Sequence, residues 1–148
     1  MARTARLKAK KPFHILCFCI QGHGQSPDLA MKIVRDLSGK DFDPFQHKTR
    51  DFLTHEGIPF RISSGGLNPR EVPLEYKRGH RLTKHDLEVA DLVITSSSDK
   101  KIPQYGERPE LHEVMDRLKR DRRVLDAFEF AKLSEAETQR RLLERMRK

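Results

Sequence analysis

Four short runs with strand character alternate along the chain with longer segments whose apolar residues have helical spacing. The first run, FHILCFC at 13–19, is continuously apolar, which is typical of a strand buried on both faces. Further runs at 60–66, 91–97 and 122–128 each predict a strand. Strict alternation of strands and helices favours a parallel sheet with helices on both faces. We therefore expect a three-layer α/β fold around a four-stranded parallel sheet.

Capping residues and breakers mark the ends of the predicted helices. Ser26-Pro27 suits an N-cap and a first helical position, and apolar residues follow with helical spacing until Ser38–Gly39. Residues 44–56 have a second helical pattern, which Gly57 would stop. Residues 67–80 contain several breakers and little periodicity, and so predict a loop.

The second half of the chain contains two capping-box patterns. Thr83 with Asp86, and Ser134 with Glu137, have the three-residue spacing in which each partner satisfies a backbone N–H of the other. They predict a short helix through Ala90 and a final helix after Ser134. Between them, apolar residues with helical spacing predict a helix over 109–120.

Length and charge indicate one densely charged domain with anionic partners. The 148 residues are most simply one domain over 12–148, preceded by a basic tail over 1–11. Much of the net charge of +8 is terminal, because the tail has five basic residues and no acid, and 140–148 has five against one. This balance favours a phosphorylated protein, a small anionic ligand or, through the basic tails, nucleic acid.

Other classes of protein are disfavoured by what the sequence does not contain. It has no apolar run near the roughly 18 residues that span a membrane and no signal-peptide pattern, so we expect a cytoplasmic protein without a membrane partner. No motif calls for a cofactor. We also expect no bound metal. The nearest candidate ligands are His14, Cys17, Cys19 and His23, but we place the two cysteines on opposite faces of the strand, where they could not bind one ion. The sequence contains no second cluster of ligands.

Cys19 ends the first predicted strand and opens the stretch CIQGHGQSP at 19–27. In parallel sheets, ligands bind at the carboxyl ends of the strands, near a switch in strand order. A turn of backbone N–H groups that leads into a helix N-terminus favours a thiolate and binds phosphate oxygens. The stretch therefore predicts a thiolate nucleophile beneath a bound anion.

Four stretches of the chain, beginning with this loop, carry a family resemblance. The loop reads C-x5-Q-S-P, FRISSGG at 60–66 is a strand ending in small residues, LTKHDLEVADLVIT at 82–95 joins an acidic helix to a strand, and RRVLDAFEF follows at 122–130. Together they resemble the low-molecular-weight protein tyrosine phosphatases and the arsenate reductases of the same fold, whose loop motif is C-x5-R-S-P. The resemblance covers about residues 12–147 and includes short predicted phosphatases.

The resemblance implies a role for each position of the site. Cys19 would be the nucleophile, and the backbone of the loop would bind the anion. Ser26 would hydrogen-bond the thiolate, and Asp126 or Glu129, near the fourth strand, would protonate the leaving group. The implied anion-binding residues are Ile20, Gln21, Gly22, His23, Gly24, Gln25 and Ser26.

Gln25 stands where the family has arginine. An arginine would bind two phosphate oxygens and neutralise their charge, whereas a glutamine amide only donates hydrogen bonds. By analogy with the loss of an oxyanion donor, the rate should fall roughly 10²- to 10³-fold. We expect a weak or inactive phosphatase that keeps an anion-binding loop, unless His23 or a distant arginine (Arg70, Arg78 or Arg81) supplies the charge. The alternative is a non-enzymatic binding module that uses the fold as a platform and its basic tails for nucleic acid or a partner protein.

Overall fold

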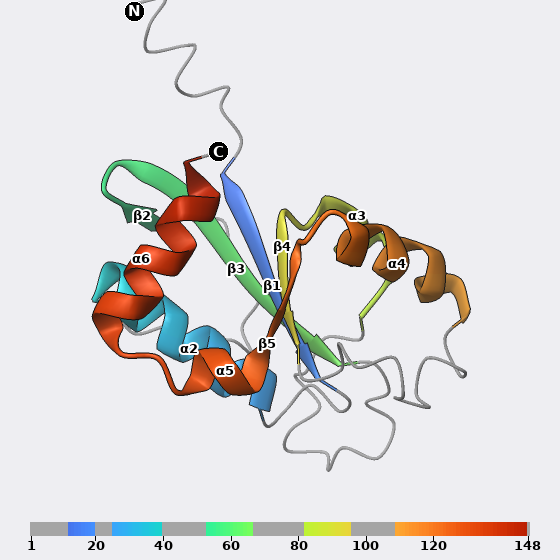
Figure 1. Ribbon diagram of the computed structural model, residues 1–148, viewed down its shortest axis with the longest axis horizontal. Coiled ribbons are helices and arrows are strands. Elements are labelled where there is room, and N and C mark those ends of the chain that lie inside the picture. The colour runs from blue at the N-terminus through green and yellow to red at the C-terminus, as the bar shows by residue number, and fades with distance from the viewer. Residues whose placement is uncertain (1–11, 20–24, 40–52, 67–81, 96–108, 148) are drawn as a thin grey trace, which may run out of the picture.

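The computed structural model describes residues 12–19, 25–39, 53–66, 82–95 and 109–147 (Figure 1). Strands and helices alternate along these segments as expected for an α/β protein. In chain order the elements are β1 (Phe13–Cys19), α2 (Gln25–Ser38), β2 (Leu53–His55), β3 (Ile58–Gly66), α3 (Lys84–Val89), β4 (Leu92–Thr95), the 3-10 turn η4 (Pro109–Leu111), α4 (His112–Arg120), β5 (Val124–Asp126), α5 (Ala127–Ala131) and α6 (Glu135–Met146).

The strands form one five-stranded mixed sheet in the order β2-β3-β1-β4-β5. β3, β1, β4 and β5 are parallel, and β2 is an antiparallel strand at the edge beside β3. The four parallel strands are the four that the sequence predicts, so the parallel core is confirmed. The expectation of a four-stranded, wholly parallel sheet is wrong, because β2 adds a fifth strand.

β2 lies where the sequence pattern predicts the end of a helix over 44–56. Residues 53–55 instead pair with β3 through a two-residue turn at Glu56 and Gly57, both of which have positive φ, 51° and 80°. Two consecutive positive φ angles are typical of the type I′ turn, whose twist suits a hairpin, and a glycine takes one of them without strain. The remainder of the predicted helix lies outside the described residues, as do the basic tail and the predicted loop at 67–80.

β1 is apolar at almost every position because helices cover both of its faces. Ile15 and Cys17 pack into a core with α2, α5 and α6, whereas Leu16 and Phe18 pack into a second core with α3 and α4. Figure 1 shows these two groups of helices on opposite sides of the sheet. Successive side chains of a strand point to opposite faces, so a strand between two cores needs apolar residues throughout. Burying each large side chain contributes about 1.5–3 kcal/mol relative to exposing it.

Both predicted capping boxes are confirmed. Asp86 N–H donates to the Thr83 hydroxyl at 3.1 Å, while Thr83 N–H donates to the Asp86 carboxylate at 2.8 Å. At α6, Glu137 N–H donates to the Ser134 hydroxyl at 3.2 Å and Ser134 N–H to the Glu137 carboxylate at 3.3 Å. Ser134 N–H and the Ser134 hydroxyl, at 3.0 Å, both donate to the Glu137 carboxylate and lower its pKa, because they favour the charged form.

Two other predicted boundaries are wrong. α2 begins at Gln25, so Ser26 lies inside its first turn and is not the N-cap. β5 ends at Asp126 and does not continue to residue 128, because the Asp126 carboxylate accepts a hydrogen bond from Phe128 N–H at 2.9 Å and caps α5. The short α5 therefore starts where the sequence pattern predicts the last residues of a strand.

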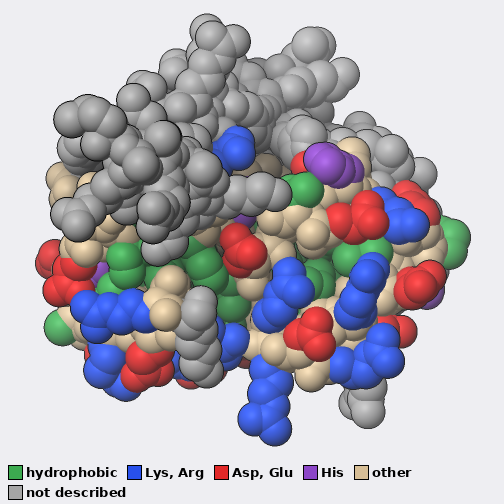
Figure 2. All heavy atoms as spheres, turned by 90° about the horizontal axis from the view of Figure 1, so that it is seen from above, with side chains coloured by type: hydrophobic (Ala, Val, Ile, Leu, Met, Phe, Trp, Pro, Cys, Tyr) green, Lys and Arg blue, Asp and Glu red, His purple; other side chains and the backbone are tan. Residues whose placement is uncertain are grey.

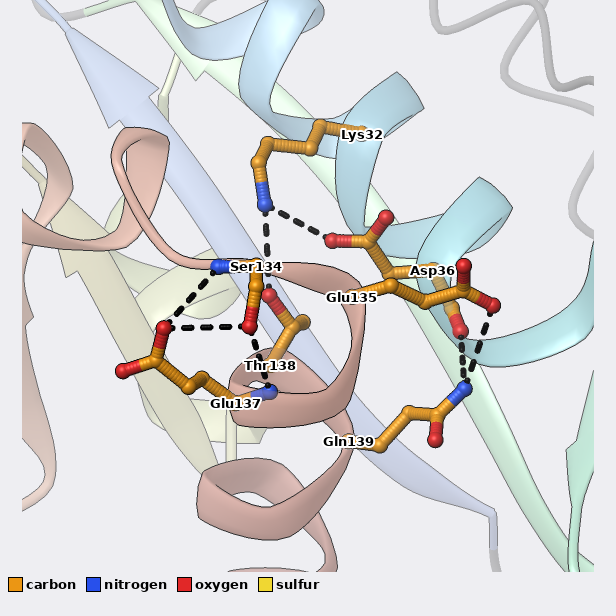
Figure 3. A network of polar contacts seen from close by, with 7 residues as sticks. All are labelled: Lys32, Asp36, Ser134, Glu135, Glu137, Thr138 and Gln139. Atoms are coloured by element: carbon orange, nitrogen blue, oxygen red, sulfur yellow. Dashed lines mark hydrogen bonds and ion pairs between the residues drawn. The ribbon is translucent and has the colours of Figure 1, made fainter.

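A polar network holds α6 against α2 (Figure 3). Lys32 Nζ of α2 donates to Asp36 Oδ2 at 2.7 Å and to Thr138 Oγ1 of α6 at 3.2 Å. Gln139 Nε2 donates to the Asp36 carbonyl at 2.8 Å. Thr138 is fully buried, so its hydroxyl needs this partner. The network fixes the orientation of α2, the helix that follows the candidate loop.

Candidate functional site

Cys19 lies at the point where the strand order reverses. It is the last residue of β1. The next two parallel strands of the chain, β3 and β4, lie on opposite sides of β1, so the chain changes direction across the sheet there. Cys19 pairs with Gly66 at the end of β3, and α2 begins six residues after Cys19. In open α/β sheets, ligands bind outside the carboxyl ends of the strands at this kind of switch point. Cys19 is thus placed where this class of fold binds its ligands.

The two cysteines occupy the same face of β1. The expectation of opposite faces is wrong, because residues two apart in a strand point to one side. Neither cysteine is in a disulfide, and Cys17 is packed in the core with α2, where burial raises its pKa far above the ordinary range. Cys19 is 8% exposed at the strand end. Of the two, Cys19 is the one that a ligand at the carboxyl edge can reach.

The sequence predicts that the loop between Cys19 and α2 binds the anion. Residues 20–24 lie outside the described residues, so the roles of Ile20, Gln21, Gly22, His23 and Gly24 stay predictions. Gln25 and Ser26 form the first turn of α2. The first backbone N–H groups of a helix have no partner within the helix and favour negative charge.

The structure separates the two candidate acids. Asp126 ends β5 and pairs with Thr95, which pairs in turn with Phe18 beside Cys19. Two strand spacings of about 4.8 Å place β5 roughly 10 Å from β1, and this register puts Asp126 on the face of Phe18, opposite to the face of Cys19. Glu129 lies on α5, and its carboxylate forms an ion pair with Arg141 of α6 at 2.5 Å. Of the two candidates, Asp126 is the one without an ion pair among the described residues.

Phe128 is an exposed aromatic residue that the sequence analysis did not single out. It lies on α5 two residues after Asp126 and is 57% exposed, whereas the neighbouring Phe130 is buried. The pattern DAFEF contains a signal for this, since residues 128 and 130 cannot both face the core of one helix. Phe128 offers an apolar contact beside the candidate acid.

His14 forms a second polar cluster, at the start of β1 and on the face covered by α3. Its Nε2 lies 2.8 Å from Ser63 Oγ, and its backbone N–H donates to Asp91 Oδ2 at 2.8 Å. Burial, followed by the nearby Arg61 guanidinium, lowers the pKa of His14, although Asp91 opposes the shift. This cluster lies at the amino ends of the strands, away from Cys19, so His14 is not part of the candidate site.

The described segments contain neither a group of metal ligands nor a membrane-spanning helix. Within them, no three His, Cys, Asp or Glu side chains are grouped so as to hold a metal ion. None of the described helices combines the length and apolar character needed to cross a membrane.

Comparisons of the chain with protein-family models, with curated proteins and with solved structures found no match. The assignment of a function therefore depends on the chain's own residues and on where the fold places them.

Proposed function

We propose that this protein binds phosphate-like anions at the carboxyl edge of its sheet and is a weak phosphatase of the low-molecular-weight tyrosine phosphatase type. The observation that carries the proposal is the position of Cys19, at the end of β1 and at the switch in strand order, six residues before α2 begins. Among the parallel strands the spatial order is second, first, third, fourth, a doubly wound arrangement with its ligand crevice beside the first strand.

The proposed reaction has two steps. The Cys19 thiolate attacks phosphorus, the bond from phosphorus to the ester oxygen breaks, and the Asp126 carboxyl gives its proton to the leaving oxygen. Water then attacks the cysteinyl-phosphate, the Asp126 carboxylate takes a proton from that water, and the sulfur leaves as thiolate. The products are an alcohol or phenol and inorganic phosphate.

Asp126 is preferred to Glu129 because of where each carboxylate lies. Asp126 is exposed at the same sheet edge as Cys19 and accepts one backbone hydrogen bond, from Phe128. Glu129 is committed to Arg141, which also lies over the Phe130 ring at 5.1 Å from its centre. To act as the acid, Glu129 would have to leave this pair.

Gln25 is the reason for proposing a weak enzyme. Its amide can donate hydrogen bonds, but it brings no positive charge to a phosphate that carries up to two negative charges. A hydrogen bond to a charged group contributes about 1.5–3 kcal/mol. The anion should still bind through backbone N–H groups, and the charge that builds up during transfer should be poorly stabilised.

Hydrolysis of p-nitrophenyl phosphate and of phenyl phosphate tests the proposal. We expect slow turnover by the wild type and none by Cys19→Ser. Asp126→Asn should reduce kcat at least 10-fold for phenyl phosphate, the poorer leaving group, and Glu129→Gln, a matched removal of one carboxylate, should change it less than 2-fold. Activity that survives in Cys19→Ser, or rapid wild-type turnover, would contradict the proposal.

Binding is tested separately by thermal unfolding. Inorganic phosphate should raise the Tm of the wild type and of Cys19→Ser, because a ligand that binds only the folded state stabilises it. A Tm that is indifferent to phosphate would refute the anion site itself. Phosphate protection without any turnover would leave a binding protein in place of an enzyme.

A further inference from the structure

The turn between α4 and β5 carries a concentration of positive charge. It lies at the end of the sheet where the parallel strands begin, opposite the end that carries Cys19. Residues 117–123, RLKRDRR, contain five basic residues and one acid, a formal charge of +4. Arg117, Arg120 and Arg122 are exposed. The turn leads directly into β5, so it lies at the amino ends of the parallel strands.

Arg122 occupies a backbone position that favours glycine. Its φ is 58°, Arg122 N–H donates to the Lys119 carbonyl at 3.0 Å, and Arg123 N–H donates to the Leu118 carbonyl at 2.9 Å. These two bonds define a Schellman motif, in which the residue with positive φ is usually glycine. A side chain is unfavourable there because its Cβ crowds the backbone. Strained residues of this kind are concentrated at functional sites.

α6 brings further arginines to the same edge. Arg145 donates a hydrogen bond from Nη1 to the Arg122 carbonyl, and Arg147 pairs with Glu56, in the turn between β2 and β3, at 2.8 Å. Figure 2 looks onto this end of the molecule, where Lys and Arg side chains lie across the face with Asp and Glu side chains between them. We define the basic edge as Arg117, Lys119, Arg120, Arg122, Arg123, Arg145 and Arg147.

Three acids near this edge already have partners, whereas Glu113 and Asp116 of α4 line a hollow together with Lys119 and Arg120. Asp121 lies 3.7 Å from Arg123, Glu56 is paired with Arg147, and Asp91 accepts the His14 backbone N–H. Within the described segments, no carboxylate forms an ion pair with the exposed Arg117, Arg120 or Arg122 side chains. The fold therefore gathers cations from α4, its following turn and α6 without neutralising all of them.

We propose that the basic edge binds the phosphate backbone of nucleic acid. The edge runs from the start of β3 to the start of β5, three strand spacings or about 14 Å, which suits a row of phosphates better than a single small anion. Most of its cations are arginines, whose planar guanidinium matches phosphate geometry. A membrane surface fits less well. Among the described residues only Val89 and Phe128 are large, apolar and exposed, and Phe128 lies at the other edge.

The test is binding of the full chain to a fluorescein-labelled DNA duplex of about 20 base pairs, measured by anisotropy at several salt concentrations. With about four phosphates contacted, affinity should fall roughly 100-fold between about 50 and 200 mM NaCl. Arg117→Ala/Arg120→Ala/Arg122→Gly should weaken binding at least 10-fold and reduce the salt dependence. Lys8→Ala/Lys10→Ala/Lys11→Ala removes the same charge from the N-terminal tail and should change affinity less than 3-fold.

The single variant Arg122→Gly separates binding from folding. Its Tm should rise, because glycine suits the positive φ, while its affinity for the duplex should fall about 3-fold through the loss of one phosphate contact. No salt-dependent binding by the wild type would overturn the proposal. So would an equal effect of the tail variant, or tighter binding to phosphatidylserine vesicles than to the duplex. None of these residues belongs to the Cys19 site, so failure at one edge leaves the other proposal standing.

Discussion

The two ends of the sheet differ in where they place arginine. At the carboxyl end of β1, the residue six positions after Cys19 is the uncharged Gln25. At the amino edge, the backbone favours a glycine after α4, and the chain has Arg122 with φ of 58°. The first end thus presents a strand-terminal thiol before a helix that starts with an uncharged residue, whereas the second keeps a charge at a cost in backbone strain. The contrast shows that charge and backbone geometry are set independently at the two ends of one sheet.

The largest effect is expected from restoring the missing charge. Gln25→Arg should raise kcat/KM for p-nitrophenyl phosphate roughly 10²- to 10³-fold, about 2.7–4 kcal/mol, because a guanidinium would stabilise the charge on the transferring phosphoryl group. Steady-state kinetics measure it. The matched control is Arg122→Lys, an arginine change at the opposite edge, which should leave hydrolysis unchanged. No gain in Gln25→Arg would mean that the carboxyl edge lacks more than a charge.

Loosening α6, the helix that reaches both edges, should have a moderate effect on stability. Thr138→Val preserves shape and deletes the buried hydroxyl that accepts from Lys32, so the free energy of unfolding should fall by about 1 kcal/mol. Urea unfolding measures this change. Thr54→Val, on the exposed edge strand β2, makes the same chemical change without a buried partner and should stay within about 0.5 kcal/mol of wild type. Equal losses in the two variants would show that the network in Figure 3 does not hold the helix.

A gain in the free energy of unfolding, similar in size to that loss, is expected from a substitution at the amino edge. Arg122→Gly should raise the free energy of unfolding by about 1 kcal/mol, because the left-handed conformation no longer carries a side chain. Arg120→Gly, two residues earlier at the last position of α4, is the matched control and should lower it, because glycine disfavours a helix. A loss of stability in Arg122→Gly would remove the evidence of strain and with it the contrast between the edges.

The smallest effect is a dependence of stability on pH at the start of β1. Burial and Arg61 lower the pKa of His14 from 6.5, against the opposing charges of Asp91 and Asp86 and a hydrogen bond to the Val89 carbonyl. The unfolded chain therefore takes up this proton at a higher pH than the folded one. The contribution of His14 is fully present above about pH 6.5 and is lost as the pH falls through the lowered pKa.

Thermal unfolding between about pH 7.5 and 5.5 checks this sign. The matched variant is His14→Gln, which can still hydrogen-bond Ser63 but does not titrate. Its Tm should fall less than that of the wild type as the pH is lowered. A steeper fall in His14→Gln would show that the protonated imidazole stabilises the fold.

The sequence predicts well the parts of the fold that depend on local signals. β1 begins and ends where its apolar run does, because both faces are buried. Both capping boxes form because their partners are three residues apart. β2 was missed because its stability comes from pairing with β3, and a pattern within one segment cannot show a partner elsewhere in the chain.

The candidate site also has parts that the sequence predicts and parts that only the structure shows. The position of Cys19 at a strand end follows from the sequence, and the strand order that makes this end a switch point is supplied by the structure. The family resemblance implies either Asp126 or Glu129 as the acid, since both lie near the fourth strand. The ion pair between Glu129 and Arg141 depends on how α6 packs, which no local pattern contains.

The most direct test of the central claim is to trap the covalent intermediate on Cys19. Gln25→Arg protein is mixed with p-nitrophenyl phosphate, quenched in acid during the first turnover, and analysed by peptide mass spectrometry. The account predicts a phosphate group on Cys19 in this variant and none in Gln25→Arg/Cys19→Ser, which should also lack hydrolysis. Hydrolysis that proceeds while Cys19 remains unlabelled would contradict it.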